Sequence, residues 1–406
     1  MLFRSALLSA AFWAVFLAGV RVAAVPPEDC GEDNAAAIEG AARAAIAWIE
    51  NNQLPDGTYV YEYNRATGET TPQYNSVRHA GLTMSLYQAA GHFQDPAMLA
   101  AADRGLAWML QRTAQRGDWT ALAASGTTAE LGGSDLMLVS LAERRVVTGD
   151  TRYDDLMRRM ARFIVSLQRD DGGYYIGYDL AGGVPQYEGT SKYYPGESLL
   201  ALTMTQDAFP GEGWDTYARK TLDFIATRRD DVEDVDYPPL ADQWAGYGIG
   251  EVAGWSPGLT SEEADYARLL AGRFGLLVRT EAERQGSWYG LLVRGRHARG
   301  AGSGTWIEGL AGLWRASQED ARLADLAGPL KGRAVCVSGI MAANQVSPEE
   351  AAAYADPVKV TGAWFINDVT RMDDQQHTLS GLMYTLDALA GDADRAPATT
   401  LPTPSP

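Results

Sequence analysis

The sequence repeats one pattern of apolar residues six times, and this repeat limits the possible folds more than any other feature of the chain. Apolar side chains stand at offsets 0, 3, 7, 10 and 11, which places them on one face of an α-helix. Polar residues interrupt three copies, with Thr221 in the fourth, Arg273 in the fifth and Arg333 in the sixth. A fixed repeat of amphipathic helices predicts a repeat architecture. The six copies begin at Ile38, Leu99, Tyr153, Trp214, Tyr266 and Leu330.

Six further helical stretches, rich in small residues, lie between the amphipathic helices. Their Gly and Ala content suits close packing on the inside of a ring, whereas amphipathic helices suit its outside. Six outer and six inner helices in alternation predict an all-α fold, an (α/α)6 toroid, over residues 25–390. The inner stretches begin near Ser76, Gly133, Gly196, Ala241, Ser303 and Gln375.

A second repeat follows three of the outer helices. Gln53, Gln168 and Gln345 each stand four residues after the last apolar position, and two of them extend to Q-x-x-D-G-x-Y, at 53–59 and 168–174. Asp-Gly favours a tight turn, and we expect the glutamine to bond the exposed end of its own helix. The motif resembles the repeats of terpenoid cyclase and prenyltransferase toroids. The alternating helices, over about residues 34–390, resemble equally those of six-hairpin glycosidases and polyuronate lyases.

Residues 1–24 have the features of a secretory signal peptide. Arg4 precedes an apolar run over 6–20, and Ala23 and Ala24 are suitable for cleavage. The run is shorter than the roughly 20 residues that span a bilayer, so we expect removal, with an uncleaved anchor as the alternative. The protein would then be secreted or periplasmic, with no stable membrane insertion after signal removal. At the other end, residues 391–406 are rich in Pro and Thr and predict a disordered tail.

Cysteine usage bears on both the compartment and metal binding. Cys30 and Cys336 are the only cysteines, and an oxidising compartment favours one disulfide between them over two buried thiols. Two cysteines near opposite ends cannot form the cysteine-based zinc sites of other toroid enzymes. The acidic run over 230–236 lacks the Gly and closing Glu of an EF-hand loop, so we expect a solvated loop there. We expect neither a metal nor another cofactor.

Charge excludes one class of partner. The chain has 34 Lys and Arg against 52 Asp and Glu, a net charge of -18, and no basic run interrupts this excess. Such a surface repels phosphate backbones, so we expect no nucleic-acid partner.

The long connections of the predicted ring all follow outer helices. In a ring of antiparallel hairpins they meet on one face, and function concentrates in loops that a rigid scaffold carries. Every inner helix also begins on this face, and six helix N-termini favour a polar or anionic guest. We therefore expect the site there. The connections span 51–75, 113–132, 169–195, 229–239, 279–301 and 343–374.

Polar and aromatic residues gather at the starts of the inner helices. Their convergence from six distant repeats predicts a binding or active site. Ser134, Asp135 and Asp373 stand where helix caps are common, and we interpret them as caps. The residues expected to bind substrate are Tyr74, Asn75, Arg78, His79, Glu130, Lys192, Tyr193, Tyr194, Trp244, Trp306, Glu308 and Arg371.

Carboxyl groups in this set point to sugar chemistry. Glycoside hydrolysis needs two carboxyl groups, one protonated as the acid and one ionised as base or nucleophile. The catalytic candidates are Glu197, Asp242 and Asp374, with His377 for proton transfer and the carboxylates of the substrate-binding set behind them. We therefore predict an exported carbohydrate-active enzyme, in the first place a glycoside hydrolase acting on an oligo- or polysaccharide.

Two alternatives stay open at this point. A uronate lyase or C5-epimerase would need Asn, Arg or His to neutralise the substrate carboxylate, and Tyr or His to move a proton. Helix N-termini would favour such an anionic sugar. A noncatalytic ring that binds a polysaccharide or a protein partner is the second alternative. The residues that could serve a lyase or epimerase are Asn75, Arg78, His79, Tyr193 and His377.

Overall fold

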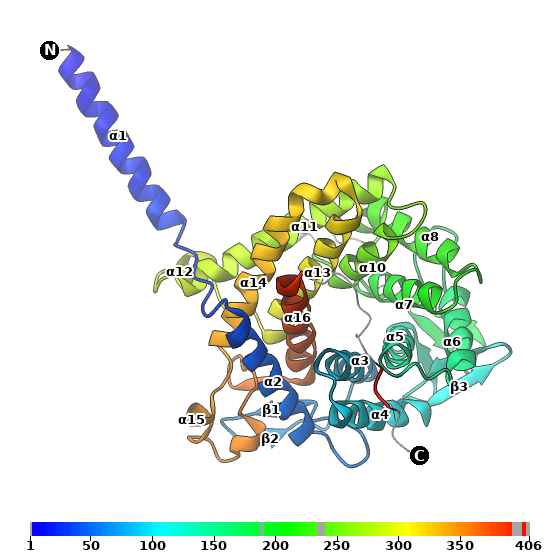
Figure 1. Cartoon of the computed structure of the whole chain (residues 1–406). Helices are drawn as coiled ribbons and strands as arrows, with labels where there is room; N and C mark the ends of the chain where they lie inside the picture. Colours follow the sequence, from blue (N-terminus) through cyan, green and yellow to red (C-terminus); the bar gives the residue numbers. More distant parts are fainter. Residues whose placement is uncertain (1, 187–188, 190, 234–239, 392–399, 403–406) are drawn as a thin grey trace.

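Outer and inner helices alternate around a closed ring in the computed structural model, which describes residues 2–186, 189, 191–233, 240–391 and 400–402 (Figure 1). The outer helices are α2 (Ala35–Asn51), α4 (Pro96–Leu110), α6 (Asp154–Ser166), α8 (Trp214–Thr227), α11 (Ser261–Gln285) and α14 (Ala327–Ala343). The inner helices are α3 (Ser76–Phe93), α5 (Leu131–Thr148), α7 (Tyr194–Ala208), α10 (Gln243–Ala253), α13 (Gly300–Glu319) and α16 (Met372–Ala390). Each inner helix packs on the next, and α16 returns to α3. The predicted (α/α)6 toroid is confirmed.

Burial explains why the two sets of helices have different sequences. Outer helix α4 buries the side of the helix that carries Leu99, Ala102, Leu106 and Met109 and leaves its other side exposed. Inner helix α7 is buried without interruption over 195–205, because neighbours surround it. A helix buried on all sides cannot alternate between apolar and polar faces. The inner helices therefore lack the pattern that reveals the outer ones.

The Q-x-x-D-G-x-Y motif joins neighbouring outer helices. Gln168 Nε2 donates to the Tyr217 carbonyl at 3.0 Å and to Thr221 Oγ1 at 2.9 Å, both on α8. Gln53 likewise donates to Ala101 of α4, and Gln345 of the last repeat donates to Ala41 of α2 at 2.9 Å. The expectation that each glutamine bonds the end of its own helix is therefore wrong. The glutamine reaches the next helix because the Asp-Gly turn brings the chain against it.

Gly57 shows why this turn needs glycine. Its φ is 87°, in the left-handed region that favours glycine. A Cβ at this position would also lie 2.2 Å from the Arg104 carbonyl oxygen of α4. The turn is thus pressed against the neighbouring helix, which a side chain would prevent.

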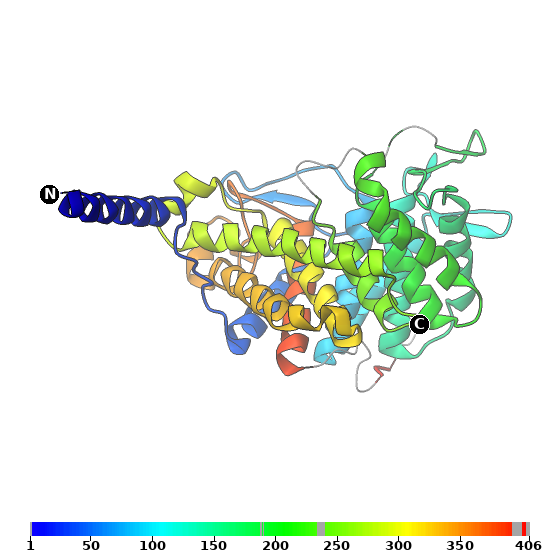
Figure 2. The same cartoon turned by 90° about the horizontal axis from the view of Figure 1, so that it is seen from above.

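Short strands and helices stiffen the long connections, which lie on one side of the ring (Figure 2). One antiparallel sheet joins β1 (Glu62–Asn64) to β2 (Glu69–Thr70) and β8 (Val369–Arg371), so it ties the first repeat to the last. The pair β3 (Thr113–Arg116) and β4 (Trp119–Leu122) forms a hairpin. The third sheet contains β5 (Thr128–Glu130), β6 (Gly177–Asp179) and β7 (Val184–Pro185). The short helices of these connections are α9 (Arg229–Val232), α12 (Gly290–Arg294), α15 (Pro348–Ala351) and η2 (Pro357–Lys359), whereas η1 (Ala321–Leu326) lies in the return connection between α13 and α14.

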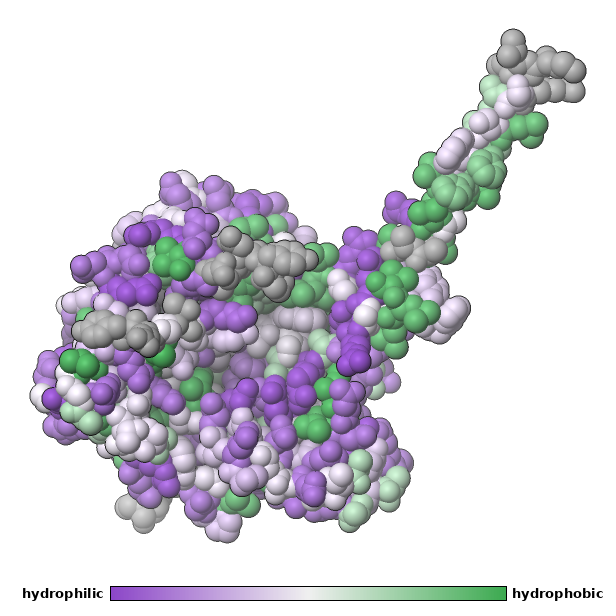
Figure 3. Space-filling model, turned by 180° about the vertical axis from the view of Figure 1, so that it is seen from behind, coloured by the Kyte–Doolittle hydropathy of each residue, from purple (hydrophilic) through white to green (hydrophobic). Residues whose placement is uncertain are grey.

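The two ends of the chain differ in how they meet the ring. Helix α1 (Leu2–Ala24) stands clear of the body, with an exposed hydrophobic surface that is compatible with a signal peptide (Figure 3). Cys30 and Cys336 form the predicted disulfide, which fixes the segment after α1 to α14. Most of the predicted tail, and residues 234–236 of the acidic run, lie outside the described residues. Within the tail, Leu401 is buried and its N–H donates to the Val147 carbonyl at 2.9 Å.

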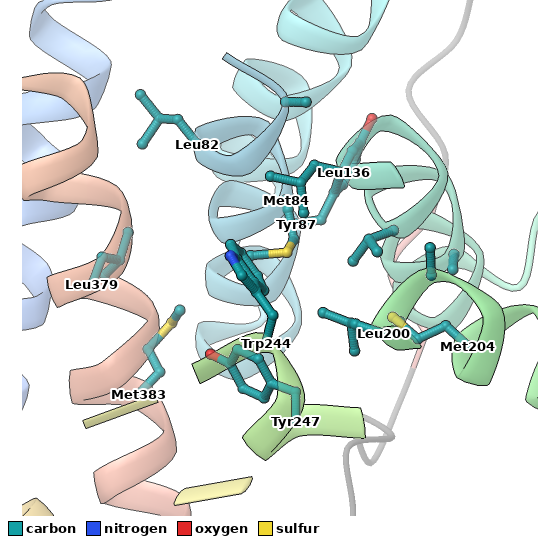
Figure 4. Packing of buried hydrophobic residues seen from close by; sticks show 14 of the residues in the cluster. Leu82, Met84, Tyr87, Leu136, Leu200, Met204, Trp244, Tyr247, Leu379 and Met383 are labelled. Carbon is teal, nitrogen blue, oxygen red and sulfur yellow. The ribbon is translucent and has the colours of Figure 1, made fainter. Parts of the chain in front are cut away.

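Hydrophobic side chains fill the middle of the ring beneath the long connections. Leu200 and Met204 of α7, Trp244 and Tyr247 of α10, and Met383 of α16 all point toward the centre (Figure 4). The middle of the ring is therefore a packed core.

Candidate functional site

A pocket of about 580 Å³ opens where the inner helices begin. Residues from the starts of five inner helices line it, together with Leu136 of α5. Several lining residues were not predicted, among them Gln243, Thr305, Asp373 and Gln376. The predicted site residues that line the pocket are Asn75, Arg78, Lys192, Tyr193, Tyr194, Glu197, Trp244, Trp306, Arg371 and His377.

Glu197 lies in the first turn of α7, in the wall of the pocket. It is 4% exposed, and its Oε2 has no hydrogen-bond partner among the described residues. Gly132 of α5 makes room for this oxygen, because a Cβ there would lie 2.4 Å from it. Burial, together with the nearby charge of Asp242, raises the pKa of Glu197 to about 8. At neutral pH Glu197 therefore carries a proton that it can donate.

Asp135 of α5 provides a further carboxyl group, which lies near Glu197. It is fully buried, its Oδ2 accepts from Ser198 Oγ at 2.9 Å, and its Oδ1 has no partner among the described residues. Burial and the nearby Glu197 carboxylate raise its pKa. The interpretation of Asp135 and Ser134 as helix caps is wrong, since α5 begins at Leu131 and the cap residue is Glu130.

Asp373 meets two arginines at the start of α16. Its Oδ2 accepts from Arg78 Nε at 2.9 Å and from Arg371 Nη2 at 3.0 Å, and its buried Oδ1 has no partner among the described residues. Arg78 also donates to the hydroxyl of Tyr61. Two guanidinium groups thus hold its Oδ2. Asp373 therefore supplies the pocket with a carboxyl group that has a free acceptor atom.

His377 follows one turn later on α16 and contacts a buried carboxylate. Its Nδ1 lies 2.7 Å from Oε2 of Glu308, which is fully buried on α13. Burial acts to lower the pKa of His377, but the charge and hydrogen bond of Glu308 outweigh it, so the pKa is raised. Because Nδ1 is engaged, Nε2 is the ring nitrogen that remains for a ligand in the pocket.

Aromatic rings and a lysine also line the pocket. Tyr193 is 43% exposed, whereas Trp244 is nearly buried and meets the His377 ring edge-on, with centroids 5.7 Å apart. Tyr194 and Trp306 complete the aromatic lining, and Lys192 lines the same pocket. Such rings offer apolar faces that pack well against sugars, with polar groups at their edges.

Asp242 lies behind the pocket wall rather than in it. Its carboxylate is fully buried and accepts from Arg229 Nη1 at 2.5 Å and from the backbone N–H groups of Trp244 and Ala245. It thus caps α10 and neutralises a buried guanidinium. Both oxygens therefore have partners within the protein, and Asp242 does not line the pocket. Its predicted catalytic role stays a prediction.

Asp374 occupies a comparable position at the start of α16. Its oxygens accept from Arg299, at 2.7 Å, and from the backbone N–H groups of Ala301 and Arg371, both at 2.9 Å. The side chain is almost fully buried and does not line the pocket. Asp374 joins the starts of α13 and α16. Its neighbour Asp373 lines the pocket, whereas the predicted catalytic residue was Asp374.

Tyr74 and His79 form a separate pair at the start of α3, with His79 buried and Tyr74 half-buried. The Tyr74 hydroxyl lies 2.6 Å from Nδ1 of His79, whose Nε2 is 2.9 Å from the Gly105 carbonyl. Burial lowers the pKa of His79 to about 4, so the ring is neutral at physiological pH. Neither residue lines the pocket. Their partners are all within the protein, which leaves them a structural position.

Asn75 and Glu130 both stand directly before inner helices. Asn75 lines the pocket, and its Oδ1 also accepts from the backbone N–H of Arg78, so it caps α3. Glu130 does not line the pocket, and its Oε2 accepts from Ser76 Oγ at 2.9 Å. Among the described residues, no group of three His, Cys, Asp or Glu side chains is placed to hold a metal ion.

Helical spacing could have identified the missed residues on α16. Asp373, Gln376 and His377 stand at i, i+3 and i+4, so they share one helix face. Once His377 is accepted as a site residue, this spacing points to Asp373 and Gln376. In contrast, Asp135 gives no such signal, because its place near Glu197 depends on how α5 packs against α7.

Solved structures of low sequence identity share this architecture over nearly the whole chain. An unsaturated glucuronyl hydrolase specific for heparin aligns with a TM-score of 0.60 at 12% identity, covering 89% of this chain and 100% of that one. Cellobiose 2-epimerase from Spirochaeta thermophila aligns at 0.55 and 15% identity, over 86% and 95%. The likeness is in the fold, an (α/α)6 toroid that these enzymes share with this chain.

An α-1,6-mannanase of Salegentibacter, solved as an inactive variant with α-1,6-mannotriose, also aligns, with a TM-score of 0.56 and 11% identity over 87% of this chain and 99% of that one. No protein-family model and no curated protein matches the sequence. The similarity therefore concerns the fold, and the chemistry has to be argued from the pocket.

Proposed function

We propose that the protein is an exported glycoside hydrolase that acts on an oligo- or polysaccharide in the long-loop pocket. The observation that carries this proposal is a pair of pocket carboxyl groups in opposite environments. Burial raises the pKa of Glu197 to about 8, whereas Asp373 pairs with Arg78 and Arg371. Two carboxyl groups with opposed environments are what glycoside hydrolysis requires. The fold neighbours, which are carbohydrate-processing enzymes, support the same substrate class.

The two groups have complementary tasks in the proposed reaction. Glu197 donates its proton to the glycosidic oxygen as the bond from that oxygen to the anomeric carbon breaks. Water attacks the anomeric carbon and passes its proton to the carboxylate of Asp373. The reaction consumes one water and yields a new reducing end. Tyr193 and Trp306 hold the sugar rings against the pocket wall.

Basic residues in the pocket favour an acidic sugar. Arg78, Lys192 and Arg371 line it, although the whole chain carries a net charge of -18. Asp373 balances part of this charge by pairing with both arginines. The ammonium group of Lys192 has no salt bridge to a described residue and is available to a carboxylate of the substrate. Uronic-acid oligosaccharides are therefore the first substrates to test.

A sugar epimerase is the second candidate, and the contact between His377 and Glu308 favours it. A histidine whose pKa a carboxylate raises can exchange a proton with a carbon atom near neutral pH. Two fold neighbours are described as cellobiose 2-epimerase and sugar epimerase. In that reaction the bond between sugars stays intact, so the two candidates give different products.

Export is part of the proposal and has two supports. Helix α1 is apolar and exposed over Ser5–Val22, as in a signal peptide, and Cys30 and Cys336 form a disulfide that suits an oxidising compartment. We expect cleavage after Ala24 and a periplasmic or secreted mature protein.

The test is to incubate the purified protein with neutral and uronic-acid oligosaccharides. Reducing ends, ultraviolet absorbance and proton NMR distinguish hydrolysis, elimination and epimerisation. We expect new reducing ends without absorbance, lost in Glu197→Gln and Asp373→Asn with affinity largely kept. The control is Asp118→Asn, an exposed carboxylate of the β3–β4 turn. Epimerised product that depends on His377 would favour the second candidate, and calorimetric binding without any product would support a noncatalytic ring.

A further inference from the structure

We infer that the segment around α12 docks the protein on the surface of a lipid bilayer. Four large apolar side chains in this short stretch are turned outward: Trp288 is 83% exposed, Leu292 is 78%, Leu291 is 42% and Val293 is 41%. They follow one another over six residues of the long connection between α11 and α13. Exposed apolar groups gathered in this way mark an interaction surface.

The position of α12 identifies the partner. The hydroxyl of Tyr289 donates to the carbonyl of Val22, at the end of α1, with a distance of 3.1 Å. Helix α1 contains an apolar window over Ser5–Val22 with a mean hydropathy of 1.7 and no buried share, so it suits a membrane either as a signal peptide before cleavage or as an uncleaved anchor. In Figures 1 and 3, α1 leaves the body next to α12, where hydrophobic surface continues onto the body. While α1 is in a membrane, α12 must therefore lie at the same membrane surface.

The residue types of α12 fit the interface between water and lipid. Tryptophan and tyrosine concentrate at that level in membrane proteins, and leucine and valine insert below it. Arg296, which follows α12, is exposed and has no ion pair with a described residue, so it can meet anionic headgroups. Because the chain as a whole carries -18, long-range attraction to an anionic bilayer is weak, and apolar insertion has to supply most of the binding.

An ion pair and a hydrogen bond at its base hold α12 in this outward position. Arg294 pairs with Glu283 of α11, which is almost fully buried. Arg284 of the same helix donates to the Arg294 carbonyl at 2.8 Å. The apolar residues are thus presented by a supported helix, so little ordering is needed when they enter the lipid. The proposed contact with lipid is peripheral, and its exposed apolar side chains remain on α12 after α1 is cleaved.

Vesicle co-sedimentation tests the inference on the full chain and on a chain that begins at Val25. Removing α1 is acceptable because its apolar window contributes no buried surface to the body. The probe is a vesicle of phosphatidylcholine with phosphatidylglycerol. We expect both chains to sediment with it, and Trp288→Ser with Leu292→Ser to weaken the binding of the shorter chain by about tenfold or more.

The matched control replaces two apolar residues that are exposed elsewhere, Val184→Ser with Val358→Ser, and should bind as the parent does. Brominated lipids should quench part of the tryptophan fluorescence of the parent. The Trp288→Phe variant should lack this quenched part. Absence of binding by the chain from Val25, or equal binding by the Trp288 and Leu292 variant, would overturn the inference. The inference would also be overturned if, without vesicles, the parent were a dimer and the Trp288 and Leu292 variant a monomer. In that case α12 would contact a second copy of the chain.

Discussion

His377 Nδ1 lies 2.7 Å from Oε2 of Glu308, and this contact joins the pocket wall to the interior of the ring. Glu308 is fully buried on α13, and His377 lies on the pocket face of α16. Burial alone would lower the pKa of His377, whereas the pair with Glu308 raises it. A buried carboxylate thus controls the charge of a pocket histidine.

Replacing Glu308 by glutamine tests this control. The substitution keeps the shape of the side chain and removes its charge, so burial then dominates and the pKa of His377 should fall. The imidazole Cε1–H resonance in NMR follows the titration, with His377→Gln to assign the signal. Asp118→Asn serves as the control, because that carboxylate is exposed and far along the chain from α16. An unchanged titration of His377 in Glu308→Gln would contradict the account.

The raised pKa of Glu197 predicts a specific dependence of stability on pH. The pKa is about 8 in the folded protein and 4.5 in the reference state, so between these values the folded state binds one proton more than the unfolded state. The stability that this proton provides is complete below pH 4.5 and is lost as the pH rises to 8. The free energy of unfolding of Glu197→Gln, relative to that of the parent, should therefore rise by on the order of 3–5 kcal/mol between pH 4 and pH 9. Urea unfolding of both proteins measures the difference, and a difference that does not change with pH would refute the assignment.

Asp242 should matter for folding more than for chemistry. Asp242→Ala removes the buried carboxylate that pairs with the fully buried Arg229, which keeps the Tyr266 hydroxyl and the more distant Asp230, and it also removes the cap of α10. We expect a loss of about 3–5 kcal/mol in the free energy of unfolding, measured in urea. Asp242→Asn retains the cap but removes the charge, so it should also be destabilised. A stable Asp242→Asn protein without turnover would instead show that Asp242 takes part in the reaction.

The turn of the first Q-x-x-D-G-x-Y motif offers a matched pair of glycines. Gly57 and Gly68 both have positive φ, at 87° and 74°, but a Cβ at Gly57 would strike the Arg104 carbonyl, whereas one at Gly68 has open space. Gly68→Ala should therefore cost only the backbone strain, about 1 kcal/mol, and Gly57→Ala distinctly more. Thermal unfolding compares them. Equal losses would show that the turn does not press on α4.

The helices could be predicted because their apolar pattern has a physical cause. Each outer helix buries one face against the ring, so residues such as Leu99 and Met109 recur at helical spacing. The strands of the long connections gave no such signal. They are two to four residues long, and some depend on partners far away in the sequence, as β1 does on β8.

The sequence also predicts that the site lies where the inner helices begin, but not which side chains face the ligand. Asp373 and Asp374 are adjacent, yet one enters the pocket and the other bonds Arg299, because successive helical residues point about 100° apart. Asp242 and Glu197 both stand at the starts of inner helices, and only packing determines that Arg229 covers the former. Sequence alone contains no information on that partner.

The dependence of hydrolysis on the leaving group tests the central claim most directly. Aryl glycosides of the sugar that the enzyme accepts, with leaving groups of graded acidity, are compared in the parent and in Glu197→Gln. If Glu197 is the proton donor, the variant should lose about 10²- to 10⁴-fold of kcat/KM on poor leaving groups and little on acidic ones, which need no proton. An equal loss on all leaving groups, or none, would contradict the claim that Glu197 is the catalytic acid.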